Sequence, residues 1–252
     1  MTPNPILKVL LTFQKFGIKS LLIGGQACII YGAAEFSRDT DFLILCETKN
    51  LNKSRKALTA LKARNIYFPS FKKEFLDKGH ACHFRCHAEP AKGLRIDLMS
   101  KLRGCDSFEK LWERRHTLKL PNNKKIEVIG LEDLVRSKKT QRDKDWLMLN
   151  RLVENDIFLT RQPSCAKIEW WLLECRNAVL LTQLAKKHKK LAEKCIGDRP
   201  LLRTALKAGT EKLQKELSKE EERERRNDKE YWQPLRRELE ILRHKGITDN
   251  RK

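Results

Sequence analysis

The chain has 252 residues, enough for one large domain or two small ones, and 40% of them are hydrophobic, enough to build a core. No window reaches the roughly eighteen consecutive apolar residues of a membrane span, so we expect no membrane-spanning helix. Lys and Arg number 54 against 33 Asp and Glu, a formal net charge of +21. This charge favours a polyanionic partner, although a basic protein without one explains it equally well.

The N-terminus and the cysteines indicate a compartment. No basic segment followed by a long apolar one opens the chain, so we expect no signal peptide. Eight cysteines are scattered without a paired framework, which is typical of reduced thiols. We therefore expect a cytoplasmic protein.

The first hundred residues alternate predicted helices and strands. Apolar residues at helical spacing predict a first helix over 5–16, which Gly17 ends. In chain order we then expect a strand over 21–25, a helix start over 26–31, a strand over 40–46, a helix over 52–64 and a strand over 66–71. Two further strands, 80–87 and 94–99, are separated by a short loop and predict a hairpin.

Helices dominate the rest of the chain. We expect a helix over 108–116, a last strand over 126–129, and helix from 131 to about 158 with a break near Thr140. No strand signal follows residues 160–165; helices are predicted over 168–188, 201–219 and 229–245, and the charge run 218–230 is a solvated helix or linker. The prediction is an α/β fold with a small mixed sheet in residues 1–160, followed by an all-helical basic domain in residues 161–252.

Two carboxylates stand at the start of the strand predicted over 40–46. Alternate residues of a strand share a face, so Asp39 and Asp41 project together while Thr40 turns away. Two such carboxylates repel each other unless a cation lies between them, and Mg²⁺ prefers oxygen ligands of this kind. A pair of metal ions about 3.5–4 Å apart would hold the entering and leaving oxygens of a phosphoryl displacement.

Asp97 is the candidate third carboxylate. It is polar and lies between Ile96 and Leu98 in an apolar strand, where an unpaired carboxylate would be expensive to bury. One interpretation is a strand-edge aspartate bonded to Arg85 or Arg95. We favour the metal interpretation because the chain already offers the carboxylate pair.

The order strand, Gly-Gly, short helix, Asp-x-Asp, strand resembles the polymerase-β-like nucleotidyltransferase superfamily. Gly24, Gly25, Asp39 and Asp41 occupy the positions of that signature, and Asp97 matches its third carboxylate. The resemblance implies that the glycine pair opens a helix whose backbone N–H groups hold nucleotide phosphates. Haloacid-dehalogenase phosphatases and many glycosyltransferases instead place their Asp-x-Asp pair after the strand. The alternative for the whole set is a core-packed glycine pair and a surface carboxylate pair that caps a strand.

A closer resemblance is to the branch that contains abortive-infection-type toxin nucleotidyltransferases. It rests on 23–41 and on 126–149, where a Leu-x-Asp-Leu helix at 131–134 precedes a lysine and an Arg-x-Lys-Asp element at 142–145. The resemblance implies nucleotide binding by Gly24, Gly25, Ser37, Lys138 or Lys139, Arg142 and Asp145, with Asp145 fixing the local geometry. The sequence does not decide which lysine meets phosphate. Relatives often have Arg four residues before the first aspartate, where this chain has Glu35.

These patterns predict a Mg²⁺- or Mn²⁺-dependent, ATP-binding class of enzyme. It would move a nucleoside monophosphate from a nucleoside triphosphate to a hydroxyl of RNA, protein or a small molecule. Asp39, Asp41 and Asp97 would be both catalytic and metal-binding residues. The alternatives are a non-catalytic RNA- or protein-binding module on the same fold, and the toxin component of a toxin–antitoxin pair.

Three other features support weaker hypotheses. The run 80–87 suggests zinc ligands at Cys82, His83, Cys86 and His87, but a strand sends the cysteines and histidines to opposite faces. His83 or Arg85 could instead face the active cleft, although a polar outer face is the simpler expectation. Trp170, Trp171 and Trp232 are better explained as core than as base-stacking residues. The basic C-terminal helices fit a solvated surface or an RNA-binding one.

Overall fold

The structure is a computed structural model that describes residues 4–34, 36–120, 124–207 and 209–249. Its described residues form a mixed α/β fold with a seven-stranded mixed sheet, many helices and a long C-terminal helix, as the sequence predicted in outline. The chain divides into two compact units, residues 1–137 with 230–252, and residues 138–229. That division differs from the boundary predicted near residue 160, and the assignment of a nucleotidyltransferase domain stays a prediction.

The sheet belongs to the first unit. Its strands are β1 (Ser20–Ile23), β2 (Asp39–Ile44), β3 (Arg64–Asn65), β4 (Cys82–Arg85), β5 (Arg95–Met99), β6 (His116–Leu120) and β7 (Lys124–Val128), in the order β3-β4-β5-β2-β1-β7-β6. The pairs β2–β5 and β1–β7 are parallel, and the other neighbours are antiparallel. Strand β1 is buried along its whole length, as its central place in the sheet requires.

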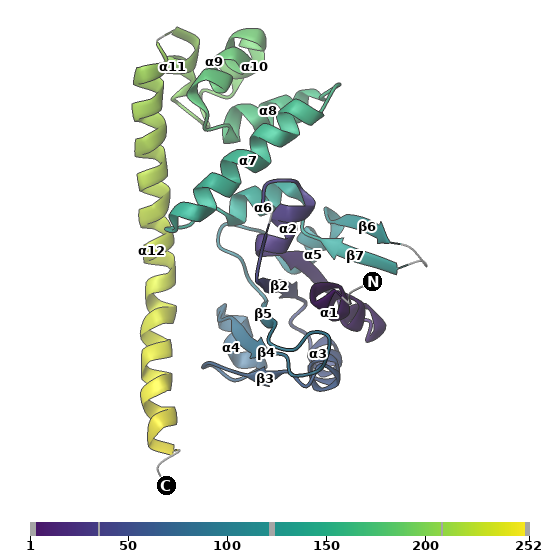
Figure 1. The fold of residues 1–252 in the computed structure, drawn as a ribbon. Helices are drawn as coiled ribbons and strands as arrows, with labels where there is room; N and C mark the ends of the chain where they lie inside the picture. Colours follow the sequence, from purple (N-terminus) through teal and green to yellow (C-terminus); the bar gives the residue numbers. More distant parts are fainter. Residues whose placement is uncertain (1–3, 35, 121–123, 208, 250–252) are drawn as a thin grey trace. The chain divides into compact units, whose positions relative to one another are not determined.

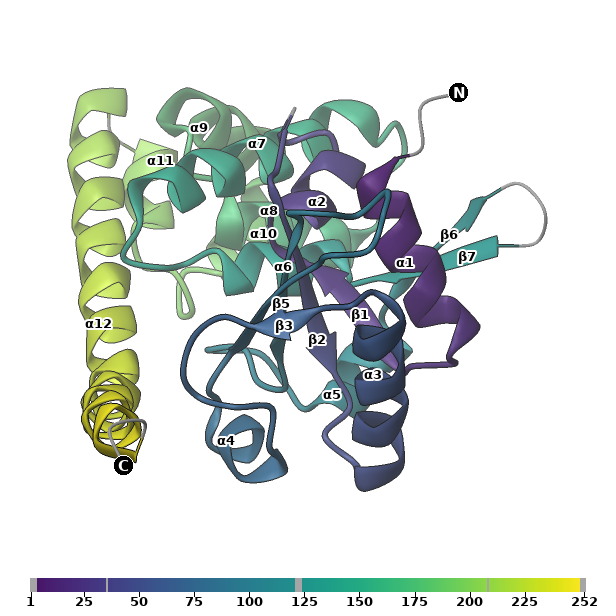
Figure 2. The same ribbon diagram turned by 60° about the horizontal axis from the view of Figure 1, so that its bottom comes forward.

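The helices of the first unit are α1 (Pro5–Lys15), α2 (Gly24–Ile30), α3 (Thr48–Ala60), α4 (Lys73–Lys78), α5 (Phe108–Glu113) and α6 (Leu131–Ser137). Asn4 caps α1 by accepting hydrogen bonds from the backbone N–H groups of Ile6 and Leu7. Helices α1 and α3 lie side by side in Figures 1 and 2, and Phe13 of α1 stacks on Phe42 of β2 at 4.3 Å between ring centroids. This contact places α1 on the face of the sheet opposite to Asp41.

Several predictions for this unit are confirmed and others are wrong. The β4–β5 hairpin forms as predicted, and β2 has the predicted alternation, with Thr40 fully buried between two partly exposed aspartates. The strand predicted over 66–71 is wrong, because β3 ends at Asn65. The predicted helix over 108–116 ends at Glu113, and the strand β6 that follows was not predicted. β6 alternates weakly and gains its stability from pairing with β7, which local spacing does not reveal.

The second unit is all-helical. It contains α7 (Asp143–Leu159), α8 (Cys165–Glu174), α9 (Ala178–Lys187), α10 (Lys189–Lys194) and α11 (Leu202–Lys207). The break predicted near Thr140 separates α6 from α7. The single helix predicted over 168–188 is wrong, because Asn177 caps a new helix by accepting from the N–H groups of Val179 and Leu180.

The three tryptophans predicted to be core residues differ in burial. Trp171 is buried, and its indole N–H donates to Asp156 at 2.7 Å. Trp170 and Trp232 are only partly buried, so the core prediction is wrong for them. The ammonium group of Lys167 lies over the ring of Trp170, 4.6 Å from its centroid. Neither ring is enclosed by the apolar residues that neighbour it in sequence.

A 40-residue helix, α12 (Thr210–Asp249), closes the described chain (Figure 1). The helix predicted over 201–219 is wrong, because it is divided between α11 and the start of α12. The charge run and the helix predicted over 229–245 continue α12 as one element, whose residues 210–229 belong to the second unit and 230–249 to the first. Pro234 lies inside it, where it removes one backbone hydrogen bond. Across the described ranges, no helix combines the length and the apolar character needed to cross a membrane.

Candidate active site

The glycine pair lies at the junction between β1 and α2, where only glycine fits. Gly24 has φ +67°, and a Cβ atom there would lie 1.9 Å from Oδ2 and 2.7 Å from Cγ of Asp41. A Cβ atom on Gly25 would lie 2.5 Å from Oγ and 2.8 Å from Cβ of Ser37. All four distances are far below van der Waals contact. The missing side chains therefore allow the first turn of α2 to approach Asp41 and Ser37 closely.

Gln26, which the sequence analysis did not single out, fixes this approach. Its buried side chain donates from Nε2 to the backbone oxygen of Ser37 at 3.0 Å and of Asp39 at 3.5 Å. The hydroxyl of Ser37 also donates to the Asp39 oxygen, at 3.2 Å. These bonds tie the start of β2 to α2. A polar residue directly after a glycine pair in an otherwise apolar segment was the signal available in the sequence.

The register of β2 and β5 brings the predicted aspartates onto one face of the sheet. Asp41 pairs with Asp97, and Asp39 pairs with Arg95, as direct partners on parallel strands. Partners in register share a face, as do alternate residues of one strand. Asp39, Asp41 and Asp97 thus lie on the same face, and Gly24 follows Ile23, the β1 partner of Asp41.

Arg95 and His83 both contact the carboxylate of Asp97. The Arg95 guanidinium donates from Nε and from a terminal nitrogen to the two carboxylate oxygens, each at 2.8 Å. His83 Nδ1 lies 2.9 Å from Oδ1 of Asp97 and 3.0 Å from the same terminal nitrogen of Arg95. The alternative partner considered from sequence, Arg85, lies opposite Arg95 instead.

The pKa shifts follow this geometry. Burial favours the neutral form of Asp97, but the hydrogen bonds and positive charges of His83 and Arg95 outweigh it and lower the pKa of Asp97. Burial alone would lower the pKa of Arg95, yet the bond to Asp97 and the charges of all three aspartates raise it. The Arg95 guanidinium is therefore the cation that balances this acidic face.

The donor set fits a hard divalent cation only in part. A carboxylate offers about four lone-pair positions, and Asp97 uses three of them on Arg95 and His83. In the described chain, no three His, Cys, Asp or Glu side chains are grouped closely enough to hold a metal ion. Asp39 and Asp41 supply the remaining oxygens. A metal on this face would use them together with the open position on Oδ2 of Asp97.

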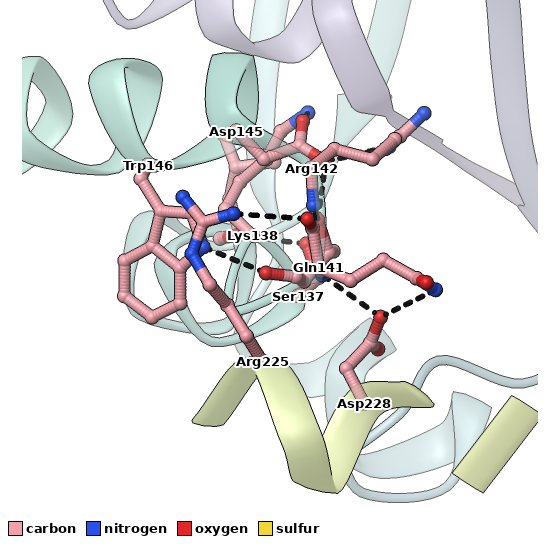
Figure 3. Close-up of polar contacts among 10 residues, drawn as sticks. Ser137, Lys138, Gln141, Arg142, Asp145, Trp146, Arg225 and Asp228 are labelled. Carbon is pink, nitrogen blue, oxygen red and sulfur yellow. Dashed lines mark hydrogen bonds and ion pairs between the residues drawn. The ribbon is translucent and has the colours of Figure 1, made fainter. Parts of the chain in front are cut away.

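The other predicted nucleotide-binding residues lie in the second unit, around the turn between α6 and α7 (Figure 3). Asp145 is buried and accepts from Lys138 at 3.0 Å, from the Thr140 hydroxyl at 2.7 Å and from Arg142 at 2.7 Å. Burial opposes its charge, but Lys138 and Arg142 prevail and lower the pKa of Asp145. Asp145 thus organises this turn through three hydrogen bonds.

The two candidate lysines have different partners. Lys138 is buried against Asp145, whereas Lys139 lies 2.8 Å from one carboxylate oxygen of Glu174 and 2.7 Å from the other. Lys138 could meet phosphate only by leaving a buried carboxylate. Lys139, which is less deeply buried, would have to exchange Glu174 for a phosphate group.

Helix α12 holds the same turn from a second side (Figure 3). Asp228 accepts from the backbone N–H of Gln141 at 3.0 Å, and Arg225 donates to the Gln141 carbonyl at 2.9 Å. Trp146 donates its indole N–H to the carbonyl of Thr140 at 2.6 Å. Arg225 and Asp228 were not identified from sequence, because they lie more than eighty residues from the turn and look like ordinary members of a charge run.

The position of residues 82–85 argues against the zinc hypothesis. Residues 82–85 form a strand, so Cys82 and His83 point to opposite faces, as expected in the argument against zinc. Burial raises the pKa of the Cys82 thiol to about 12 and of the Cys86 thiol to about 11, which keeps both protonated. Glu35, which stands where the branch that the sequence resembles often has Arg, lies outside the described residues.

Comparison with known proteins gives no relative: the chain matches no protein-family model, and no curated protein matches it. The site is therefore interpreted from its own geometry and from the motif residues.

Proposed function

We propose that the protein is a Mg²⁺-dependent nucleotidyltransferase. The observation that carries the proposal is the contact between Gly24 and Asp41, with Asp97 beside Asp41 in the sheet. The glycine pair provides a backbone that phosphate can approach closely, and the Asp-x-Asp pair provides carboxylates that can hold a cation. The contact between Gly24 and Asp41 brings these two features together. Neither a structural strand cap nor a packed core requires that combination.

The reaction would join an acceptor hydroxyl to a nucleotide. The acceptor oxygen forms a bond to the α-phosphorus, the bond from that phosphorus to the bridging oxygen breaks, and pyrophosphate leaves. The hydroxyl proton passes to water or to a carboxylate. Such a reaction depends mainly on positioning and charge neutralisation.

Each residue then has a role. Asp39, Asp41 and Asp97 would hold Mg²⁺ or Mn²⁺, which would neutralise the triphosphate. Arg95 balances the acidic face, and His83 orients Asp97 by a hydrogen bond at 2.9 Å. Gly24, Gly25 and Ser37 would receive the phosphates. Lys138, Lys139 and Arg142, the basic groups of the turn organised by Asp145 in the second unit, stay the phosphate-binding candidates that the resemblance implies.

A non-catalytic binding module on the same fold is the second candidate. It is favoured by the pairing of Asp97 with Arg95 and His83, because that pairing satisfies the buried carboxylate without a metal. A toxin restrained by a partner would use the same transferase site, so the same residues would carry that function. The acceptor would be RNA, protein or a small molecule, and we place the reaction in the cytoplasm.

Binding of each nucleoside triphosphate, measured by calorimetry in Mg²⁺ and in excess chelator, separates the two candidates. The transferase should bind at least one triphosphate in Mg²⁺ and lose at least about tenfold in affinity without it, because carboxylates on the same face of the sheet repel phosphate. Asp41→Asn should lose the metal dependence. Asp77→Asn, the same charge change on an exposed aspartate of α4, should retain it. Equal affinity with and without metal would instead support the binding module.

A further inference from the structure

A row of arginines crosses the sheet on the same face as the candidate carboxylates and ends at Asp39. In the strand register, Arg64 of β3 pairs with Arg85 of β4, Arg85 pairs with Arg95 of β5, and Arg95 pairs with Asp39 of β2. These partners share one face of the sheet, the face of Asp41 and Asp97. With strands about 4.8 Å apart, the three arginine backbones span roughly 10 Å.

Two of these arginines have no role within the described fold. Arg95 is engaged by Asp97, but Arg64 and Arg85 are exposed, and within the described ranges no carboxylate pairs with either. Like charges directly opposite each other on neighbouring strands are destabilising. An anionic ligand would relieve that repulsion, and phosphate groups match the planar donor geometry of guanidinium.

Aromatic side chains accompany the row. Tyr67 is 50% exposed; its ring meets the edge of His83 at 5.8 Å between centroids, and the Arg95 guanidinium lies 5.9 Å from its centroid. Phe68 is 40% exposed beside it. Tyr67 thus lies beside Arg95, the member of the row that is paired with Asp97, and follows Arg64 by three residues in the chain. An exposed ring beside a row of arginines is the arrangement on which single-stranded nucleic acids stack their bases and bind their phosphates.

A second set of strand partners on the same face shows on which side of the carboxylates the arginines lie. It runs from Ile23, which precedes the glycine pair, through Asp41 and Asp97 to His83. The glycines therefore lie on one side of the carboxylates, and His83, Tyr67 and the arginine row lie on the other. If the triphosphate occupies the glycine side, as the proposed function requires, the acceptor must approach from the arginine side.

We infer that the acceptor is a single-stranded polynucleotide, with its phosphates on Arg64 and Arg85 and a base stacked on Tyr67. The inference rests on the proposed function for the direction of approach, but the surface itself does not depend on catalysis. A small acceptor would not need two unpaired cations on successive strands. An acidic protein would match the charge but would leave the exposed ring unexplained.

Direct binding tests the inference without nucleotide or catalysis. Fluorescence anisotropy would follow full-length protein binding a labelled twelve-nucleotide single strand, made as RNA and as DNA, over a series of salt concentrations. Arg64→Gln/Arg85→Gln should weaken binding at least about tenfold and reduce the log–log salt slope by about 1.4, since each neutralised phosphate of a single strand contributes about 0.7. The matched control is Lys49→Gln/Lys56→Gln, which removes two exposed charges from α3 and should change affinity less than about twofold.

Tyr67 provides the second readout. Tyr67→Ala should weaken binding at least about fivefold and Tyr67→Phe should restore it, because stacking needs only the ring. Tighter binding of RNA than of DNA would identify a ribose 2′-hydroxyl contact, and equal binding would identify single strands of either kind as the ligand. Either result supports the inference.

Two outcomes would overturn it: the arginine variant behaving like the lysine control, or no single strand binding while a protein takes label from a triphosphate in extract. The proposed transferase site and the proposed polynucleotide surface can each be refuted without the other. Asp41→Asn should keep oligonucleotide binding while losing metal-dependent triphosphate binding, and the arginine variant should show the reverse pattern.

Discussion

Replacing Gly24 with Ala tests the contact that carries the functional proposal. The new Cβ would lie 1.9 Å from Oδ2 and 2.9 Å from Cβ of Asp41, so the aspartate would have to move by more than an ångström. Gly24 also has φ +67°, a conformation that an L-residue adopts at a cost. The substitution therefore imposes both a backbone penalty and a steric one.

Gly93 separates the two penalties. It lies in the β4–β5 loop with φ +84°, and a Cβ atom there would meet nothing within 4 Å. Gly93→Ala should therefore show the backbone penalty alone, about 1 kcal/mol. Gly24→Ala adds overpacking worth typically about 1–3 kcal/mol, so we expect it to lower the free energy of unfolding by about 2–4 kcal/mol.

Urea unfolding followed by circular dichroism would compare parent, Gly24→Ala, Gly93→Ala, Asp41→Ala and the double variant Gly24→Ala/Asp41→Ala. Removing the Asp41 carboxylate should recover at least about 1 kcal/mol of the loss, because residues in contact show coupling energies of that order. Gly24→Ala should also abolish metal-dependent triphosphate binding, which Gly93→Ala should preserve. Equal destabilisation by the two alanines, or no coupling to Asp41, would refute the close approach.

Three other substitutions test the surroundings of the site. Asp41→Asn should melt within a few degrees of the parent in chelator, since it removes one of three clustered carboxylates, yet transfer should fall at least about a hundredfold in a labelled-triphosphate assay. A large loss of melting temperature would make Asp41 structural. In excess chelator, Arg95→Gln should lower the free energy of unfolding by about 1–3 kcal/mol, because it leaves Asp97 largely buried without its cation. Millimolar Mg²⁺ should recover part of that loss. No recovery in thermal melts would argue against metal binding. Asp145→Asn should cost about 3–5 kcal/mol at neutral pH by leaving Lys138 buried and unpaired. Because the folded pKa of Asp145 is lowered, its stabilisation is fully present above the unfolded pKa of about 3.9 and is lost as the pH falls from there through the folded pKa. Parent and variant should therefore converge in acid unfolding.

Local patterns in the sequence determined the elements around the candidate site. The apolar run before Gly24, the Asp-x-Asp alternation and the two strands around the loop that ends at Gly93 each specify a conformation within a few residues. The structure accordingly has β1, β2 and the β4–β5 hairpin close to their predicted positions, with Thr40 facing away from Asp39 and Asp41. Strand alternation needs no information from distant residues, which is why these predictions hold.

Pairings between distant segments were decided only by the tertiary structure. The parallel register that sets Asp41 beside Asp97 joins residues 56 positions apart, and a slip of one residue would have turned Asp97 to the other face. The registers of β3 with β4 and of β4 with β5 set Arg85 opposite Arg95, set His83 opposite Asp97, and aligned Arg64, Arg85 and Arg95 in one row.

The turn at 138–142 likewise combines a feature visible in the sequence with contacts that only the folded chain reveals. Its break was visible in the sequence, but its partners Arg225 and Asp228 come from a helix that local pattern divided in two. Strand β6 was missed for a related reason, since its hydrogen bonds are made with β7 and not within itself. Periodicity reports which face of an element is apolar; which charged groups meet across elements depends on register and packing, and only the folded chain fixes those.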